Sequence, residues 1–289
     1  MTSATRQPET LPSSVPPRLI ATDLDGTLLR DDQSVSERTV AALAAAEEAG
    51  IEVFFVTGRP ARLMDVVSYH VHSHGLAICG NGAAVVDLHG GPGTHRFVKV
   101  RELARENAVD AVRLLRDAAP GTLYAVEQTY GFRQEPAYPK LHIEIPDILA
   151  PAEELLAADA PGAHEPVLKI LAYHPEMDPD AFLTLARLAI GDRASITRSS
   201  PSALLEISGP GISKASTLAL CCAELGISNE EVVAFGDMPN DVEMLTWAGR
   251  SYAMGNAHPD AIAAASGRTA ANNEDGVAVV IERILAEQL

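Results

Sequence analysis

The chain has 289 residues, a formal net charge of −17 and 47% hydrophobic residues. This length allows two domains or one large one, and the apolar content is ordinary for a globular protein. The acidic balance argues against broad binding to nucleic acid or to an anionic membrane, because both require a basic face.

The first residues, Met1 to Pro17, are rich in Thr, Ser and Pro and lack the apolar core of a signal peptide. We therefore expect a disordered tail rather than an export signal. No uninterrupted apolar stretch reaches membrane-spanning length. The three cysteines have no framework spacing, which favours reduced thiols in a cytoplasmic protein: Cys79, Cys221 and Cys222.

The first third of the chain alternates predicted strands and helices. A helix is expected from Ser34 or Ser36 to about Ala49, with Gly50 ending it, and Ser34 with Glu37 fits a capping box. Pro60 suits the first turn of the next helix. The predicted strands are Arg18–Thr22, Ile51–Val56 and Leu76–Cys79. Repeated strand–helix–strand units indicate a parallel sheet with right-handed crossovers.

The pattern changes after about Asp87, where His89–Gly93 is a cluster of turn-forming residues. Two helices are expected in the next segment, at Glu102–Ala118 and Asp178–Ala189. The strands expected around them are Leu123–Glu127, Lys140–Ile145, Val167–His174, Ala194–Arg198 and Ala203–Ser208. This segment is predicted to form an α+β unit with an antiparallel sheet.

Strand–helix alternation returns after Gly211. The elements expected there are a helix over Lys214–Leu225, a strand over Glu231–Phe235, a helix over Asp241–Ala248, a strand over Arg250–Met254 and a last helix near Gly276–Ala286. The simplest organisation is one α/β core, residues 18–88 and 209–289, interrupted by an inserted domain over 89–208.

The segment Ile20–Leu29 places Asp23 and Asp25 two residues apart at the end of a short apolar run. The carboxyl edge of an open α/β sheet is where ligands bind, so one carboxylate can act as a nucleophile and the other as an acid/base beside a divalent cation. The same residues could simply open a turn. A calcium loop is excluded, because Leu28 and Ser34 stand where Gly and a bidentate Glu are needed.

Polar residues also follow the other predicted strands or begin helices. Each has an alternative interpretation. Thr57 could do no more than end a strand, and Lys214 could be a solvated helix residue. Asp237 and Asp241 could be a helix cap and a first-turn acid that the helix dipole stabilises. A helix start alone explains a run of Asp, Asn and Asp less well, because like charges one turn apart need a cation or a lysine nearby. That run comprises Asp237, Asn240 and Asp241.

Taken together, these segments resemble the haloacid dehalogenase superfamily, and specifically its Cof-like, class IIB phosphatases. The matching motifs, in chain order, are Asp23–Leu29, Val56–Pro60, Ile212–Ala215, Gly236–Asp241, Met254–Ala257 and Asn273–Val277. Ala215 and Met238 stand where the family usually has glycine. The resemblance implies a Rossmann-like three-layer core with a parallel sheet and an inserted α+β cap domain.

The resemblance also implies a Mg²⁺-dependent phosphatase for small phosphorylated metabolites, such as sugar phosphates or phosphorylated cofactors. Asp23 would form an aspartyl-phosphate, and Asp25 would serve as acid and then base. The expected magnesium ligands are Asp23, the backbone carbonyl of Asp25, and Asp237. Asp241 would orient Lys214 or a metal-bound water.

The remaining expected site residues bind phosphate or substrate. Thr57 and Gly58 would hydrogen-bond phosphoryl oxygens, while Lys214 would neutralise the transferring group and Asn240 would support phosphate or metal. Asn81 and Gly82 stand where the family often contacts substrate. Four cap residues could line the site or belong to cap surface and core, and we favour the second interpretation: Phe132, Arg133, Tyr138 and Lys140.

Other functions remain open at this stage. A phosphomutase or phosphotransferase would pass the phosphoryl group to a second hydroxyl instead of water. A dehalogenase is less favoured, because Asp25 supplies the acid/base that phosphate esters need. A non-catalytic metabolite-binding protein would be expected to lack a motif carboxylate, and all are present.

Overall fold

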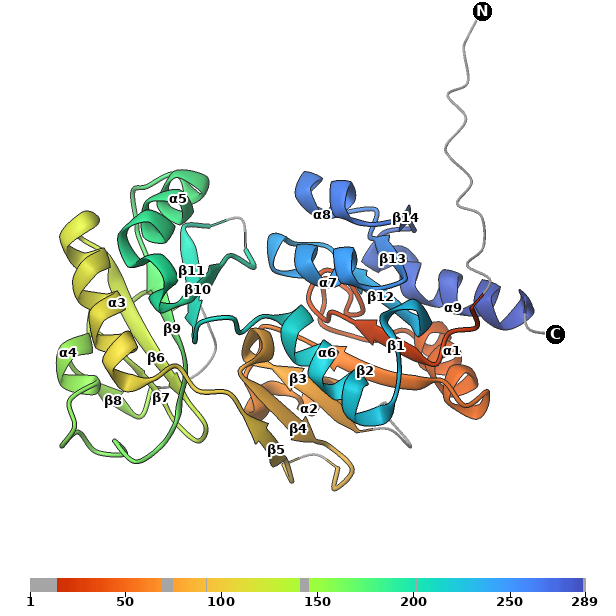
Figure 1. The fold of residues 1–289 in the computed structure, drawn as a ribbon, viewed down its shortest axis with the longest axis horizontal. Helices are drawn as coiled ribbons and strands as arrows, with labels where there is room; N and C mark the ends of the chain where they lie inside the picture. The colour runs from red at the N-terminus through yellow and green to blue at the C-terminus, as the bar shows by residue number, and fades with distance from the viewer. Residues whose placement is uncertain (1–14, 69–74, 92, 141–145, 201, 288–289) are drawn as a thin grey trace, which may run out of the picture.

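A computed structural model describes residues 15–68, 75–91, 93–140, 146–200 and 202–287. The first fourteen residues of the expected tail and most of the expected strand Lys140–Ile145 lie outside the described residues. Figure 1 shows a large sheet with helices on both faces and, beside it, a second sheet carrying its own helices.

The larger sheet has eight strands in the order β14-β13-β12-β1-β2-β3-β4-β5. The strands from β14 to β3 pair in parallel, whereas β4 and β5 run antiparallel at one edge. Their bounds are β1 Leu19–Thr22, β2 Glu52–Val56, β3 Leu76–Cys79, β4 Ala84–Asp87, β5 Arg96–Val100, β12 Val232–Gly236, β13 Arg250–Ala253 and β14 Gly267–Arg268.

Helices cover both faces of this sheet because its strands are apolar on both sides. Ile20 of β1 packs in the cluster that contains α1 and α9, while Leu19 and Ala21 pack with α6, α7 and α8. The helices are α1 Glu37–Glu48, α9 Gly276–Glu287, α6 Lys214–Leu225, α7 Val242–Trp247 and α8 Pro259–Ala264, besides the short α2 Asp65–Ser68. The result is a three-layer α/β/α core.

The second sheet has six strands in the order β10-β11-β9-β6-β7-β8. The strands are β6 Leu123–Gln128, β7 Phe132–Gln134, β8 Ile148–Leu149, β9 Val167–Tyr173, β10 Ser195–Thr197 and β11 Leu204–Ser208. Its helices, α3 Arg105–Ala118, α4 Ala152–Leu155 and α5 Pro179–Ile190, lie on the side away from the eight-stranded sheet (Figure 1). We call this second unit, residues 102–208, the cap.

Alternate residues of the cap strands face opposite ways. Ile170 and Ala172 of β9 pack against α3 and α5 in one apolar cluster. Lys169 and Leu171 therefore face the other side, toward the core, as does Glu206, which stands opposite Leu171 in the β9–β11 register. The cap thus presents a mixed polar and apolar sheet face to the core.

Several details differ from the sequence predictions. The segment Arg96–Val100 pairs with β4 in the core sheet, although the insertion was predicted to begin at 89. The cap sheet is not wholly antiparallel, because β7 and β8 pair in parallel. The predicted capping box of Ser34 is wrong: Ser36 caps α1 and accepts from the Thr39 amide. The elements that the sequence did not reveal are β4, β5, β7, β8, β14, α4 and α8.

Candidate active site

The carboxyl ends of β1 and β12 lie side by side at the centre of the core sheet. The amide of Asp23 donates to the carbonyl of Phe235 over 3.1 Å, which ties the end of β1 to its parallel neighbour. The chain leaves β1 toward β2 on one side and returns as β12 on the other, so this point is the topological switch of the sheet. Asp23 and Asp237 are brought together here from opposite ends of the sequence.

Three buried carboxylates gather around one buried ammonium at this point. One ligand oxygen from each of Asp23, Asp237 and Asp241 lies within 4.8 Å of the others. Lys214 has no exposed surface, and its Nζ lies 2.5 Å from Asp23 Oδ1 and 2.6 Å from Asp241 Oδ1. The group carries more negative than positive charge, which is the condition that a divalent cation relieves.

Burial, together with the neighbouring carboxylates, disfavours the ionised form of Asp23 and Asp237 and raises the pKa of each. Burial raises the pKa of Asp23 well above its usual value; the nearby Asp241 and Asp237 add to this, and Lys214 opposes it. Burial and the neighbouring Asp241 also raise the pKa of Asp237 to about 7. Burial alone would lower the pKa of Lys214, but Asp23 and Asp241 together raise it, so the ammonium stays charged.

The hydrogen bonds of Asp241 separate its role from those of the other two aspartates. Its Oδ1 accepts from Lys214, and its Oδ2 accepts from the amides of Asp237 and Met238 at 3.0 and 3.1 Å. With both oxygens engaged, Asp241 fixes Lys214 and the turn after β12. Asp23 and Asp237 line a cavity between the core and the cap, so their oxygens are the ones best placed to hold a cation.

Gly26 allows the turn after β1 to approach Asp237. It has a φ of 74°, and a Cβ built there would lie 2.3 Å from Asp237 Oδ2. Next to it, Thr27 Oγ1 donates to Asp237 Oδ1 over 3.3 Å, and the side-chain Nδ2 of Asn256 donates to the Gly26 carbonyl over 2.8 Å. The first, fourth and fifth sequence motifs are therefore joined by direct contacts.

Asp25 lies apart from the buried carboxylates and is held by an arginine. Its side chain is about half exposed, and Arg59 donates two hydrogen bonds to its two oxygens, at 2.7 and 2.5 Å. Arg59 also donates to Gln33. The expectation that Asp25 holds a metal through its backbone carbonyl stays a prediction, because the group of acidic residues in the structure, Asp23, Asp237 and Asp241, concerns side-chain oxygens.

Arg59 lies within the second sequence motif, Val56–Pro60, and no role was predicted for it. Two parallel N–H···O bonds fix the plane of the Asp25 carboxylate, and this geometry is specific to arginine. Sequence alone did not indicate the pairing, because 34 positions separate the two residues.

With Asp25 as the acid/base that the sequence predicts, we expect replacement of Arg59 by alanine to lower kcat for phosphate release by about 10- to 100-fold, because an acid/base that loses its orientation transfers its proton less effectively. Steady-state kinetics would measure this, with Arg59→Lys as the matched variant that keeps the charge but loses the paired geometry. An Arg59→Lys enzyme as active as wild type would mean that charge alone matters. An unchanged Arg59→Ala enzyme would contradict the positioning role.

The remaining predicted residues occupy the neighbouring turns. Thr57 Oγ1 is buried and accepts from the amide of Arg59 over 3.0 Å, and Asn240 Nδ2 donates to Asn81 Oδ1 over 3.0 Å. Gly58 and Asn240 line the cavity. Gly82 instead packs on the start of α6: a Cβ there would lie 2.3 Å from the Ser213 carbonyl. Its position supports the backbone that carries Lys214 rather than a substrate contact.

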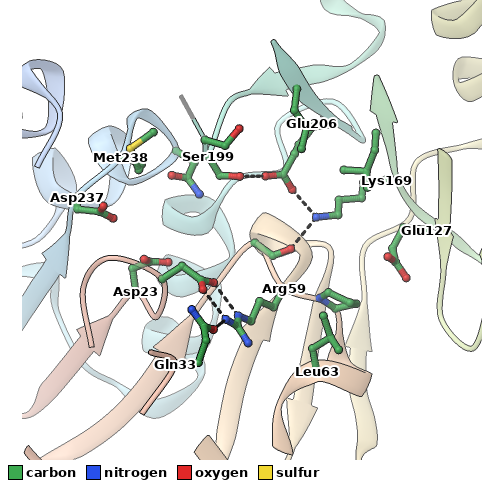
Figure 2. Close-up of a pocket in the computed structure, with 17 residues that line it drawn as sticks. Asp23, Gln33, Arg59, Leu63, Glu127, Lys169, Ser199, Glu206, Asp237 and Met238 are labelled. Carbon is green, nitrogen blue, oxygen red and sulfur yellow. Dashed lines mark hydrogen bonds and ion pairs between the residues drawn. The ribbon is translucent and has the colours of Figure 1, made fainter. Parts of the chain in front are cut away.

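A cavity of about 440 Å³ opens between these turns and the cap, which is within the range for small-molecule sites. Figure 2 shows its lining side chains converging from both units. The core supplies Asp23, Asp25, Gln33, Gly58, Arg59, Pro60, Leu63, Asp237, Met238 and Asn240; the cap supplies Glu127, Lys169, Leu171, Ser199, Ser200, Leu204 and Glu206.

The four cap residues that the sequence offered as a possible lining do not line this cavity. Phe132 and Tyr138 are buried in a small apolar cluster, Arg133 is buried and Lys140 is exposed. Two of the cap residues that line the cavity could have been found from the sequence in another way. Lys169 and Glu206 are single charged residues inside apolar strand sequences, and charged residues are rarely buried without a partner.

Comparison with known proteins adds a sequence relationship. The sequence model of a family described as haloacid dehalogenase-like hydrolase matches residues 20–281. The chain is 30% identical over 288 residues to YxeH of Bacillus subtilis, covering 93% of this chain and 98% of that protein. It is 29% identical over 264 residues to the 5-amino-6-(5-phospho-D-ribitylamino)uracil phosphatase YcsE of the same organism, covering 91% and 94%.

A solved structure of a haloacid dehalogenase-like hydrolase from B. subtilis has the same fold. It aligns with a TM-score of 0.77 and 26% identity, covering 92% of this chain and 99% of that one. Within the described residues, no helix has both the length and the apolar character needed to cross a bilayer.

Proposed function

Because this chain belongs to the haloacid dehalogenase-like hydrolases, we propose that it is a Mg²⁺-dependent phosphatase that hydrolyses small phosphorylated metabolites through an aspartyl-phosphate. A relative that matches over most of its length is named as a phosphatase of a phosphorylated ribityl compound. The observation that carries the proposal is the meeting of Asp23 and Asp237 beside Lys214 at the end of β1.

Asp23 is the nucleophile in this proposal. One of its oxygens forms a bond to phosphorus while the bond from phosphorus to the leaving oxygen breaks. Asp25, in its protonated form and with one oxygen released from Arg59, delivers its proton to that leaving oxygen and becomes the carboxylate that Arg59 holds on both oxygens. In the second half of the reaction, Asp25 takes a proton from water and the water oxygen bonds to phosphorus. The bond between phosphorus and Asp23 then breaks, which releases phosphate and restores the Asp23 carboxylate.

The other groups bind the phosphoryl group and stabilise its negative charge. Lys214 offsets the negative charge that Asp23 and the phosphoryl group bring together, and Asp241 keeps the ammonium in place. The turn at Thr57 and Gly58 and the side chain of Asn240 would hold phosphoryl oxygens, and Gly58 and Asn240 line the cavity. Mg²⁺, held by Asp23, the Asp25 carbonyl and Asp237, would neutralise phosphoryl charge and fix its orientation.

The experiment that tests this function measures inorganic phosphate released from a panel of phosphate monoesters, with Mg²⁺ and with a chelator. We expect turnover with Mg²⁺, and a loss of at least about 100-fold when the ion is removed, because the buried carboxylates would then repel the phosphoryl group. Phosphate release without an added acceptor distinguishes hydrolysis from phosphotransfer. No release from any ester, with ligands still bound tightly, would contradict the proposal.

A further inference from the structure

The turn after β2, residues 57–59, has three consecutive backbone carbonyls that are held from two different units. The two outer carbonyls, of Thr57 and Arg59, accept from backbone amides of the core turn after β3, over 3.0 and 2.9 Å. The middle carbonyl, of Gly58, accepts from Lys169 Nζ of the cap over 2.6 Å. Within the described part of the chain, the hydrogen bonds of this turn are therefore completed by a side chain from the other unit.

The peptide group between Gly58 and Arg59 links this contact to the expected chemistry. Its carbonyl accepts from Lys169, and its N–H donates to Thr57 Oγ1 over 3.0 Å. The side chain of Arg59 then holds Asp25. Glycine resists backbone rotation less than any other residue, so the hydrogen bonds at the two ends decide the plane of this peptide. Fixing that plane fixes both the turn and the point from which the Arg59 side chain departs.

Glu206 keeps the ammonium of Lys169 in place. The two residues are only 4% and 3% exposed, and they form an ion pair across the cap face (Figure 2). Glu206 also accepts from the hydroxyl of Ser199. A Cβ built on Gly58 would lie 3.4 Å from Glu206 Oε1, so the pair lies directly over the turn. Each charge of the pair is engaged by the other, and what the pair supplies to the core is the fixed direction of one N–H bond.

The packing of the cap alone does not account for a lysine at this place. On the same sheet face, Leu171 and Leu204 lie in an apolar cluster. Burying two charges costs several kcal/mol per ion before their attraction offsets it, and an apolar pair of similar volume is often equally stable. A buried lysine that reaches a backbone carbonyl of the other unit therefore points to a role at the site.

A second ion pair docks the cap onto the same stretch of the core. Arg62, three residues after Arg59, donates to Glu127 of β6. Glu127 stands opposite Lys169 in the β6–β9 register, so the two contacts lie side by side. Arg62 holds the cap from outside the turn, whereas Lys169 acts on the backbone of the turn itself. This difference allows docking and alignment to be tested separately.

We propose that Lys169 is a positioning residue for phosphoryl transfer: from the docked cap, its ammonium fixes the peptide between Gly58 and Arg59 and so aligns the phosphate-binding turn and the arginine that holds Asp25. This inference rests on the proposed function, since it concerns the alignment of that same site. Because the ammonium belongs to the cap, the alignment exists only while the cap is docked. Because the turn serves every phosphate ester alike, the effect does not depend on the leaving group.

Removal of the ammonium tests the role. We expect Lys169→Met to lower kcat by about 10- to 100-fold while KM changes by less than about threefold, with the same factors for p-nitrophenyl phosphate and glucose 6-phosphate. Steady-state phosphate release in excess Mg²⁺ would measure both constants. A rise in KM at unchanged kcat, or a loss confined to one of the two esters, would indicate a direct contact with the leaving group and overturn the inference.

A double variant separates alignment from stability. Lys169→Met leaves Glu206 buried without its cation, which lowers the stability of the cap. Lys169→Met/Glu206→Gln removes both charges, so its melting temperature should lie within about 5 °C of that of the wild type. Its kcat should be as low as that of Lys169→Met. A folded double variant with the kcat of the wild type would overturn the inference, because the turn would then be aligned without the ammonium.

Arg62→Gln weakens docking without removing the contact to the turn, and we expect it to lower kcat by less than about threefold. A loss as large as that of Lys169→Met would mean that docking alone matters, and would overturn the inference.

Lys140→Met is the matched control, because it removes the same charge from an exposed cap position that does not line the cavity. Its kcat and KM should equal those of the wild type. Failure of the wild type to release phosphate from either ester, or from the wider panel, would contradict the proposed function. An active wild type whose kcat does not respond to Lys169→Met would overturn the positioning role alone.

Discussion

Replacement of Asp23 by asparagine is expected to abolish phosphate release, with a fall in kcat of about 10⁴-fold or more, as for other enzymes that lose a nucleophile. The amide keeps the size of the side chain but cannot form the acyl-phosphate bond. Phosphate release under single-turnover conditions, with enzyme in excess, would measure the loss. Turnover within about tenfold of wild type would exclude Asp23 as the nucleophile.

The fold of the Asp23→Asn protein should survive the change. Burial and the neighbouring carboxylates already disfavour the charge of Asp23, and Lys214 keeps Asp241 as a partner. We therefore expect a melting temperature in chelator that equals or exceeds that of the wild type. Asp117→Asn, which removes the same charge from an exposed position on α3, controls for net charge and should leave both turnover and melting temperature unchanged.

Replacement of Lys214 by methionine is expected to damage stability as well as activity. Methionine keeps the unbranched shape of the side chain and lacks only its terminal ammonium position, but it leaves three buried carboxylates without their cation. Removing one partner of a buried ion pair typically lowers the free energy of unfolding by about 3–5 kcal/mol. Urea unfolding in chelator would measure the loss, and the rate of phosphate release should fall by about 100-fold or more.

A second substitution identifies the cause of that instability. In the Asp23→Asn/Lys214→Met protein one of the three carboxylates is absent, so part of the stability should return. Mg²⁺ should also stabilise the Lys214→Met protein, because the ion replaces the missing positive charge. A Lys214→Met protein as stable as wild type in chelator would contradict the view that Lys214 neutralises this cluster.

The sequence predicted the core elements closely because their signals are local. A buried strand followed by a turn is visible in Leu19–Thr22 and the residues after it, and the helix Lys214–Leu225 was predicted with its observed bounds. Strands that repeat in this way form a parallel sheet whose carboxyl ends share one edge. The meeting of Asp23, Lys214 and Asp237 follows from that rule, and the structure places them together.

The edges of the two units were predicted less well. The strand Arg96–Val100 follows a cluster of turn residues, and nothing local shows that it pairs with β4 in the core sheet. The short strands β7, β8 and β14 contain two or three residues each and give no periodic signal of their own. Tertiary pairing, rather than propensity, decides such elements.

By itself, the sequence determined the α/β class and the polar residues that follow the core strands in chain order. It also determined which carboxylates lie at the centre of the site. Only the tertiary structure decided that Arg59 holds Asp25 and that Lys169 and Glu206 form the cap wall of the cavity. The reason is physical: a strand-end residue is placed by its own strand, whereas contacts across sheets depend on register and on how the cap docks against the core.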